Sequence, residues 1–167
     1  MKPTRSDHVS DADLARMGLS RETDLVLTKE GRFFSGAQPI EHPGIAAAFA
    51  RWVERTPEGR YVLRNDLHYV YVTVEDAPLH ARGARIEGER VILELQGGVE
   101  EALRPETLRR DEEGALYAAG RDGSWEIRLA PAAVLALEPL LEEDEGDPDG
   151  GNPVLVLQGE RHPIPPR

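Results

Sequence analysis

Glycine and proline interrupt this chain at short intervals, with 16 Gly and 13 Pro spread through 167 residues. Apolar runs bounded so closely by turn-forming residues have the length of β-strands and leave room for few long helices. Leu25–Leu27, the turn Lys29-Glu30-Gly31 and Phe33-Phe34 are typical of a first hairpin. The pattern predicts an α+β fold with antiparallel sheets.

Further strands are expected by the same reasoning at 61–63, 69–74, 79–86, 90–95, 116–119, 125–129 and 154–157. In the segment 69–74, valines alternate with Tyr69, Tyr71 and Thr73, so a regular strand would place the valines on one face. Glu75 would then lie on the face of the two tyrosines.

Three helices are predicted. Ser10 should cap a short helix over Asp11–Met17. Proline at an early position should open the other two helices, at His42-Pro43 and at Pro131. Their apolar stripes are Ile45, Phe49, Trp52 and Val53 in the second helix, and Val134, Leu137 and Leu141 in the third. Pro139 should interrupt the third helix, because it removes a backbone hydrogen bond.

A hairpin followed by a proline and a helix occurs in both halves of the sequence, which predicts duplicated hairpin-plus-helix units around antiparallel sheets. We divide the chain into a polar N-terminal arm (1–22), an N-terminal α+β half (23–78) and a C-terminal α+β half (79–167). The C-terminal half contains an acidic loop at 142–152.

Charge limits the partners. With 20 basic and 31 acidic residues, the net charge is 20 − 31 = −11, which argues against a nucleic-acid or anionic-membrane partner. The absence of Cys excludes disulfides, thiolate nucleophiles and Cys-ligated metal. The first twenty residues contain no targeting segment, so we expect a cytoplasmic, bacterial-type protein.

Three spaced motifs, Gly31–Phe34, Gly36…Pro39-Ile40 and Val74-Glu75-Asp76-Ala77-Pro78, resemble the bacterial family of unknown function DUF1285. The resemblance extends from about Leu25 to Glu143, with a looser match at 154–159. It implies a duplicated α+β core whose C-terminal half is similar to pleckstrin-homology-like folds. It also implies a ligand site between the two halves and a regulatory or signalling role.

The chain departs from the family pattern at two places. Asn65-Asp66-Leu67-His68-Tyr69 stands where the family has a Thr-Pro-x-Glu-Lys stretch, and Leu79 replaces a phenylalanine after Asp-Ala-Pro. If the family's Glu-Lys pair contacts the ligand, this protein binds something different or lacks that contact.

Glu75 and Asp76 are the first candidates for acid–base chemistry. Adjacent residues of a strand point to opposite faces, so the two carboxylates cannot converge on one bond while the strand stays regular. We therefore expect Asp76 to bond backbone amides in the turn before Pro78, and Glu75 to be the better candidate for a ligand contact.

Metal chemistry has little support in the sequence. The histidines are His8, His42, His68, His80 and His162, and none forms a His-Glu-x-x-His motif. An EF-hand with Glu145, Asp147, Asp149 and Gly150 fails, because position 12 is Val156 rather than a bidentate Glu. We expect no metal and no cofactor, and the sequence lacks the glycine-rich and Gly-x-Ser-x-Gly motifs of nucleotide and serine chemistry.

Arginines surround the first hairpin of the C-terminal half, 79–95, and a short helical turn expected at 105–108. Arg82, Arg85 and Arg90, with Arg104, Arg109 and Arg110, have the chemistry to hold a phosphate or carboxylate, although surface pairing with acids is the commoner role.

We therefore predict a non-enzymatic module that binds a small anionic or nucleotide-like ligand. Its ligand-binding residues are His68, Tyr69, Glu75, Arg82 and Arg85, and no residue is assigned as catalytic. Two alternatives remain: a hydrolase or metal-assisted enzyme that uses Glu75, Asp76 and His68, and a domain that binds a protein partner.

Overall fold

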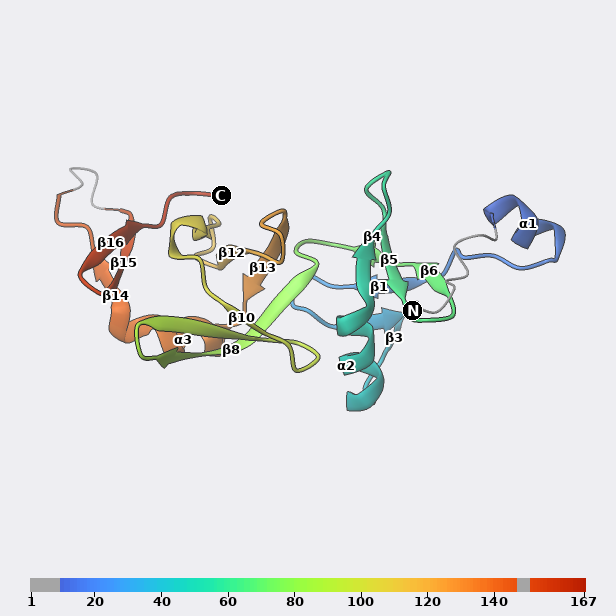
Figure 1. Cartoon of the computed structure of the whole chain (residues 1–167), viewed down its shortest axis with the longest axis horizontal. Coiled ribbons are helices and arrows are strands. Elements are labelled where there is room, and N and C mark those ends of the chain that lie inside the picture. The colour runs from blue at the N-terminus through green and yellow to red at the C-terminus, as the bar shows by residue number, and fades with distance from the viewer. Residues whose placement is uncertain (1–9, 147–150) are drawn as a thin grey trace. The chain divides into compact units, whose positions relative to one another are not determined.

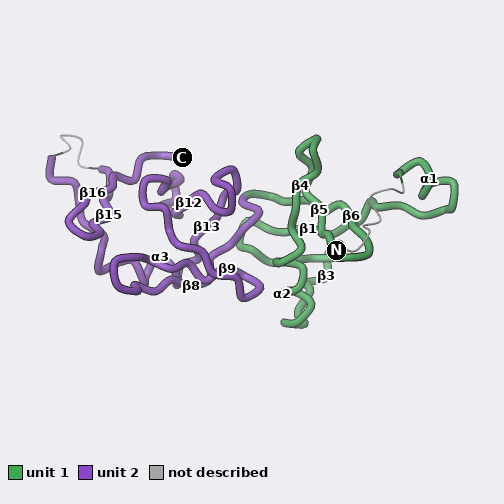
Figure 2. Tube along the Cα trace, viewed as in Figure 1, with its two compact units in different colours: residues 1–76 green, residues 77–167 purple. Residues whose placement is uncertain are grey.

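The computed structural model describes residues 10–146 and 151–167, and the chain divides into two compact units, Met1–Asp76 and Ala77–Arg167 (Figures 1 and 2). The division expected from the sequence lies two residues later, after Pro78. Both units mix helices with antiparallel sheets, as an α+β fold requires. Within the described residues, no helix combines the length and apolar character needed to span a membrane.

The elements of unit 1 are α1 (Asp11–Arg16), β1 (Leu25–Leu27), β2 (Phe33–Ser35), β3 (Gln38–Pro39), α2 (Pro43–Trp52), β4 (Val53–Arg55), β5 (Tyr61–Arg64), β6 (Tyr69–Tyr71) and β7 (Thr73–Val74). They form two sheets with the strand orders β3-β2-β1-β7 and β4-β5-β6. All pairs are antiparallel except β1 with β7.

Local sequence signals explain the first hairpin and the second helix. Gly31 adopts a φ of 84° in the turn between β1 and β2, where a residue with a Cβ would be strained. The His42 imidazole caps α2 by accepting hydrogen bonds at Nδ1 from the amides of Gly44 and Ile45, at 3.1 and 3.3 Å. The expected apolar stripe is shorter than predicted, because Ile45 is exposed and Val53 already belongs to β4.

The prediction of a single strand over 69–74 is wrong, because this segment forms two strands, β6 and β7. The chain leaves one sheet and enters the other at Val72: β6 pairs with β5, whereas β7 pairs with β1. The alternation therefore does not define one continuous face, and it no longer predicts that Glu75 lies beside Tyr69 and Tyr71.

The elements of unit 2 are β8 (Leu79–Glu87), β9 (Arg90–Leu95), β10 (Glu100–Ala102), the 3₁₀ helix η2 (Pro105–Thr107), β11 (Arg109–Arg110), β12 (Leu116–Gly120), β13 (Trp125–Leu129), α3 (Pro131–Leu137), the 3₁₀ helix η3 (Glu138–Leu140), β14 (Leu141–Glu143), β15 (Pro153–Leu157) and β16 (Glu160–Pro163). A six-stranded sheet has the order β10-β9-β8-β13-β12-β11, and a three-stranded sheet has the order β14-β15-β16.

The third helix packs on β8 (Figure 1), and its buried residues are Ala133 and Leu137. Pro139 does interrupt it, since the chain continues as the 3₁₀ helix η3. The predicted stripe of Val134, Leu137 and Leu141 is wrong, because Leu137 is fully buried while the other two line a groove described below.

The element order repeats between the units. The hairpin β1–β2 precedes α2 and the three-stranded sheet β4-β5-β6, and the hairpin β12–β13 precedes α3 and the three-stranded sheet β14-β15-β16. Each hairpin also pairs in parallel with one further strand of its unit, β7 or β8. The repetition extends the predicted hairpin-plus-helix unit by a whole sheet. The likeness of unit 2 to pleckstrin-homology-like folds stays a prediction.

Two segments named from sequence extend beyond the described residues. His8 in the arm, and Asp147, Asp149 and Gly150 in the acidic loop, lie outside them. In the described part of the arm, the predicted helix is observed as α1, capped by the Ser10 side chain. Glu142 and Glu143 belong to β14, so part of the segment named as a loop is a strand.

Candidate functional site

The five predicted ligand-binding residues fall in both units: His68, Tyr69 and Glu75 in unit 1, and Arg82 and Arg85 in unit 2. Their grouping into one site stays a prediction. Within each unit, however, the structure shows what each side chain contacts.

Glu75 supports the first hairpin. Its Oε2 accepts a hydrogen bond of 3.1 Å from the backbone amide of Lys29 in the turn between β1 and β2. Asp76 lies in the bend that follows β7. In the part of the chain that the structure describes, no three His, Asp or Glu side chains come together as a metal site.

His68 and Tyr69 line a cavity of about 80 Å³ in unit 1, together with Phe49, Trp52 and Leu63 among others. Pockets for small molecules usually measure roughly 300–1,000 Å³. The cavity therefore has room for a few atoms and not for a nucleotide.

Arg85 is held on the surface of unit 2 by acids of its own strand β8 and of β10. Its Nη1 and Nη2 donate to the two carboxylate oxygens of Glu100, at 2.7 and 2.9 Å, and its Nε donates to Glu87 at 3.0 Å. The hydrogen bonds to Glu100 and then to Glu87 raise the pKa of Arg85, and the bond to Arg85 lowers the pKa of Glu100. Arg82 is exposed beside the irregularity in β8 between Ala81 and Gly83. These contacts match the surface-pairing interpretation of the arginines.

His80 has a structural role. It is buried, and its Nε2 lies 3.0 Å from the carbonyl oxygen of Ala77. A buried imidazole with a backbone partner stabilises the start of β8 without any ligand.

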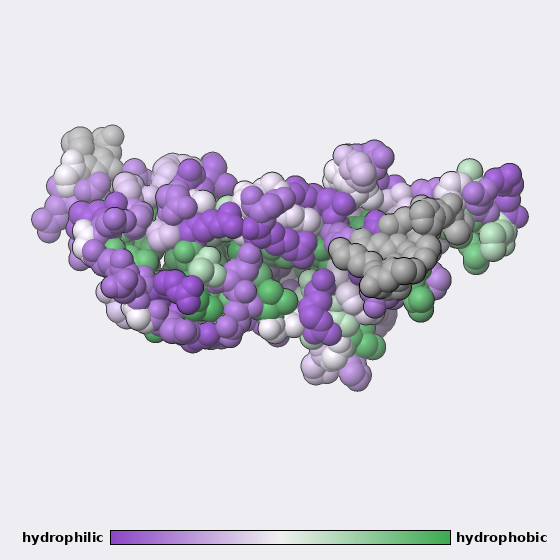
Figure 3. Space-filling view, viewed as in Figure 1, coloured by the Kyte–Doolittle hydropathy of each residue, from purple (hydrophilic) through white to green (hydrophobic). Residues whose placement is uncertain are grey.

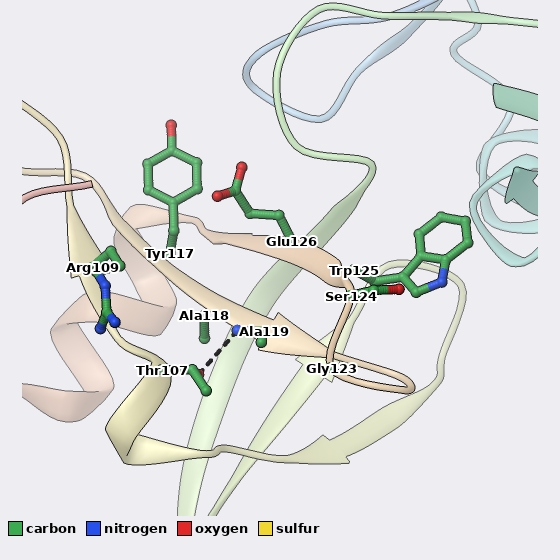
Figure 4. Close-up of a pocket in the computed structure, with 9 residues that line it drawn as sticks. All are labelled: Thr107, Arg109, Tyr117, Ala118, Ala119, Gly123, Ser124, Trp125 and Glu126. Carbon is green, nitrogen blue, oxygen red and sulfur yellow. Dashed lines mark hydrogen bonds between the residues drawn. The ribbon is translucent and has the colours of Figure 1, made fainter. Parts of the chain in front are cut away.

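Figure 4 shows a pocket of about 220 Å³ over β12 and β13, whose lining includes Thr107, Arg109, Ser124 and Glu126. The space exists because Ala118 and Ala119 are small. The polar lining groups already bond within the protein. The Thr107 hydroxyl donates to the Arg104 carbonyl oxygen and accepts from the Ala119 amide (Figure 4). Arg109 donates to two backbone carbonyl oxygens, Ser124 donates to Asp122, and Glu126 accepts from Arg167. A ligand here would have to replace these bonds.

A larger groove lies on the outer face of α3 in the same unit. Its volume is about 530 Å³, and we call it the α3 groove; it is lined by Glu113, Gly114, Ala115, Arg128, Leu129, Pro131, Val134, Leu135, Glu138 and Leu141. Pro131, Val134, Leu135 and Glu138 follow the i, i+3, i+4, i+7 spacing of one helix face. That face is opposite to the one that buries Ala133 and Leu137.

The α3 groove is apolar at its base and charged around it. Leu129 is 2% exposed, whereas Leu135 is 67% exposed. Arg128 brings a guanidinium whose Nη1 donates to the Tyr117 hydroxyl at 2.9 Å, and Glu113 and Glu138 bring carboxylates. In Figure 3, apolar residues show between the hydrophilic ones that cover most of the visible surface. The arrangement can hold an apolar molecular body and meet a charged group at one end.

Sequence reasoning missed this groove. The spacing of Pro131, Val134, Leu135 and Glu138 was visible in the sequence, but the approach of the turn Glu113–Ala115 to the helix was not, because nothing local links the two segments.

No family model matches the chain, and no curated protein matches it. Two solved structures do. A DUF1285 family protein from Silicibacter pomeroyi DSS-3 is 20% identical, with a TM-score of 0.65 over 86% of this chain and 80% of that one. A DUF1285 family protein from Shewanella baltica OS155 is 18% identical, with a TM-score of 0.52 over 68% of this chain and 88% of that one. The chain thus has the fold of the DUF1285 family proteins, as the spaced motifs predicted.

Proposed function

We propose that this protein is a non-enzymatic small-molecule-binding module and that the α3 groove holds its ligand. The ligand has an apolar body and one anionic group, either a carboxylate or a phosphate. The observation that carries the proposal is the helix face of Pro131, Val134 and Leu135, which lines one groove with the apolar side chains of Leu129 and Leu141 and leaves Leu135 67% exposed.

The size and chemistry of the groove support this choice over the other two pockets. Its volume of about 530 Å³ lies inside the usual range for small-molecule sites, roughly 300–1,000 Å³. Its apolar lining gains free energy when a ligand removes it from water. In contrast, the unit 1 cavity of about 80 Å³ is too small, and the pocket in Figure 4 has a largely polar lining whose side chains bond to neighbouring residues of the protein.

The anionic group is assigned from Arg128. A guanidinium forms strong, charge-assisted hydrogen bonds with carboxylates and phosphates. The carboxylates of Glu113 and Glu138 should repel a second anionic group. The proposed ligand therefore carries one anionic group on an otherwise apolar body. We include in the proposal the regulatory or signalling role that the family resemblance implies, and we assign no reaction to the groove.

Three probes with the same alkyl chain test the proposal: decanoate, decanol and decylamine, each added to the full chain and followed by thermal shift and by amide chemical shifts. We expect decanoate to bind most tightly and to perturb the amides of 113–115 and 128–135. In Val134→Trp, the indole should fill the groove and abolish binding. In Arg128→Gln, decanoate should no longer bind more tightly than decanol. The ratio of the two affinities is measured on the same variant, so it does not depend on the stability of that variant. Tightest binding by decylamine, or equal binding by Val134→Trp, would overturn the proposal.

A further inference from the structure

Unit 1 contains a compact group of three arginines and two tyrosines, which we call the Arg–Tyr cluster: Arg21, Arg60, Arg64, Tyr69 and Tyr71. The guanidinium carbons of Arg21 and Arg64 lie 3.7 and 4.5 Å from the centre of the Tyr69 ring, and that of Arg60 lies 3.4 Å from the centre of the Tyr71 ring. The two rings meet edge to face with their centres 6.0 Å apart. Such contacts fix the guanidinium groups in place.

Each arginine of the cluster also meets a carboxylate. Arg64 Nε lies 2.9 Å from Glu54 Oε2 on the neighbouring strand β4. The other two carboxylates come from the N-terminal arm. Asp11 lies 3.2 Å from Arg21 Nε and accepts a hydrogen bond of 2.9 Å from the Tyr71 hydroxyl. Glu22 accepts two bonds from Arg60, at 3.0 and 3.1 Å. Arg21 itself belongs to the arm, so the arm places the Glu22 carboxylate on Arg60 and the Asp11 carboxylate on Tyr71, two residues outside it.

The arm and the adjoining Thr23 meet the outer edge of β6, the last strand in the order β4-β5-β6, through one backbone bond and two side-chain bonds. The Tyr71 amide donates to the Arg21 carbonyl oxygen at 2.9 Å, and the Thr23 hydroxyl donates to the Tyr71 carbonyl oxygen at 2.7 Å. Arg21 Nη1 donates to the Tyr69 carbonyl oxygen at 3.0 Å. An extended peptide that adds to the edge of a sheet uses the same kind of contact, with backbone bonds for affinity and side chains for specificity.

The covalent attachment of the arm explains how such a surface is kept from other acidic segments. A tethered segment acts at an effective concentration in the millimolar range, so a free peptide of equal affinity competes poorly. The net charge of −11 also repels acidic partners at long range. Binding of an external segment therefore requires that the arm be displaced.

We propose that the edge of β6 and the side chains of Arg60 and Tyr71 form a docking site for an extended acidic segment of a partner protein, and that the chain's own arm occupies this site as an intramolecular competitor. The site lies in unit 1 and is independent of the α3 groove. The partner segment contributes a carboxylate in the place of Glu22 and a second in the place of Asp11.

A labelled peptide with the sequence of residues 10–24 is the probe, and its anisotropy is measured with the full chain. We expect weak binding to the wild type and binding about tenfold tighter or more to the variant Asp11→Asn/Glu22→Gln, whose own arm competes less well. Adding Arg60→Glu to that variant should abolish binding, and a peptide with Glu22→Lys should restore it, which shows that the variant is folded.

Arg161→Glu is the matched control, since Arg161 and Glu142 form a surface pair with 50% and 54% exposed side chains, close to the 51% and 64% of Arg60 and Glu22. It should leave peptide binding unchanged. Equal binding by the wild type and the double variant, or equal binding of a scrambled peptide, would overturn the proposal. Dimers of the wild-type chain at the same concentrations would also overturn it, because the occupant would then be the arm of a second copy.

Discussion

Asp11 and Tyr71 are 60 residues apart in the sequence, yet the Tyr71 hydroxyl donates a hydrogen bond of 2.9 Å to the Asp11 carboxylate. The bond joins the N-terminal arm to β6, and Arg21 and Arg60 lie in the same group of contacts. Side chains that are distant in the sequence thereby hold the polar N-terminal arm against the sheet.

The hydrogen bond to Asp11 raises the pKa of Tyr71 from its ordinary value of 10.0 to about 12. Because the raised pKa favours the protonated tyrosine in the folded chain, its contribution to stability is present below pH 10 and is lost as the pH rises through 12. Asp11→Asn should return the pKa of Tyr71 toward 10, as measured by the absorbance of tyrosinate. The variant Tyr71→Phe identifies which of the four tyrosine titrations belongs to Tyr71. The control Asp13→Asn, on the same helix as Asp11, should leave the pKa of Tyr71 unchanged. An unchanged titration in Asp11→Asn would contradict the bond.

The Arg85–Glu100 pair should stabilise unit 2 in a pH-dependent way. Arg85 lowers the pKa of Glu100, so this contribution is present above the ordinary pKa of 4.5 and is lost as the pH falls through the lower folded value. The difference in Tm between the wild type and Glu100→Gln should therefore shrink as the pH falls below 4.5. It should also shrink in high salt, because both side chains are largely exposed. A difference that grows on acidification would contradict this assignment.

Gly120 is required where β12 passes the Ile127 side chain. A Cβ at Gly120 would lie 2.5 Å from Ile127 Cδ1 and 2.7 Å from Glu101 Oε2. Gly120→Ala should lower the free energy of unfolding by about 1–3 kcal/mol, the usual cost of overpacking. Ile127→Val removes the Cδ1 methyl, so the double variant should lose less than the sum of the two single changes in urea unfolding.

Gly83→Ala is the control in the same sheet. The nearest atom to its added Cβ is Glu94 Oε2 at 2.8 Å, the end of an exposed and flexible side chain that can move away. The alanine there should cost much less than at Gly120. Strictly additive effects at Gly120 and Ile127, or equal costs at Gly83 and Gly120, would show that the close approach is not what requires glycine.

Leu135 and Leu67 allow a matched test of the α3 groove, since each is 67% exposed and they lie in different units. Neither Leu135→Asp nor Leu67→Asp should change the free energy of unfolding by more than about 0.5 kcal/mol, as is usual for surface positions. Only Leu135→Asp should weaken decanoate binding, because it places a carboxylate at the groove. Titration of each variant by thermal shift distinguishes the two, and equal losses would place the probe elsewhere.

The elements that the sequence predicted correctly depend on adjacent residues. Gly31 and Gly88 permit the turns of two hairpins through positive φ, and His42-Pro43 begins α2 by capping it. Each of these choices is made within a few residues, so it can be recognised without knowing the rest of the fold. The repetition of hairpin and helix was recognisable for the same reason.

The missed strands are short and lie at the edges of sheets. The strands β4, β10, β11, β14 and β16 are two to four residues long and each bonds to one strand only, so their own residues form too short a pattern to recognise. The alternation in 69–74 was read as one strand, but pairing with β5 on one side and with β1 on the other divides it at Val72.

The candidate sites divide in the same way. The excess of acidic residues and the start of α3 at Pro131 follow from composition and spacing, whereas the exposed face of Val134 and Leu135 was not predicted, because Val134 was assigned to a stripe with Leu137 and Leu141. Folding of each unit is what brings the turn Glu113–Ala115 to one side of that face, Arg85 to Glu100, and Asp11 to Tyr71. The two kinds of feature differ because a turn or cap is selected by the conformations open to a few neighbouring residues. A contact between distant segments forms only when the packing of the whole unit repays the entropy lost in bringing them together.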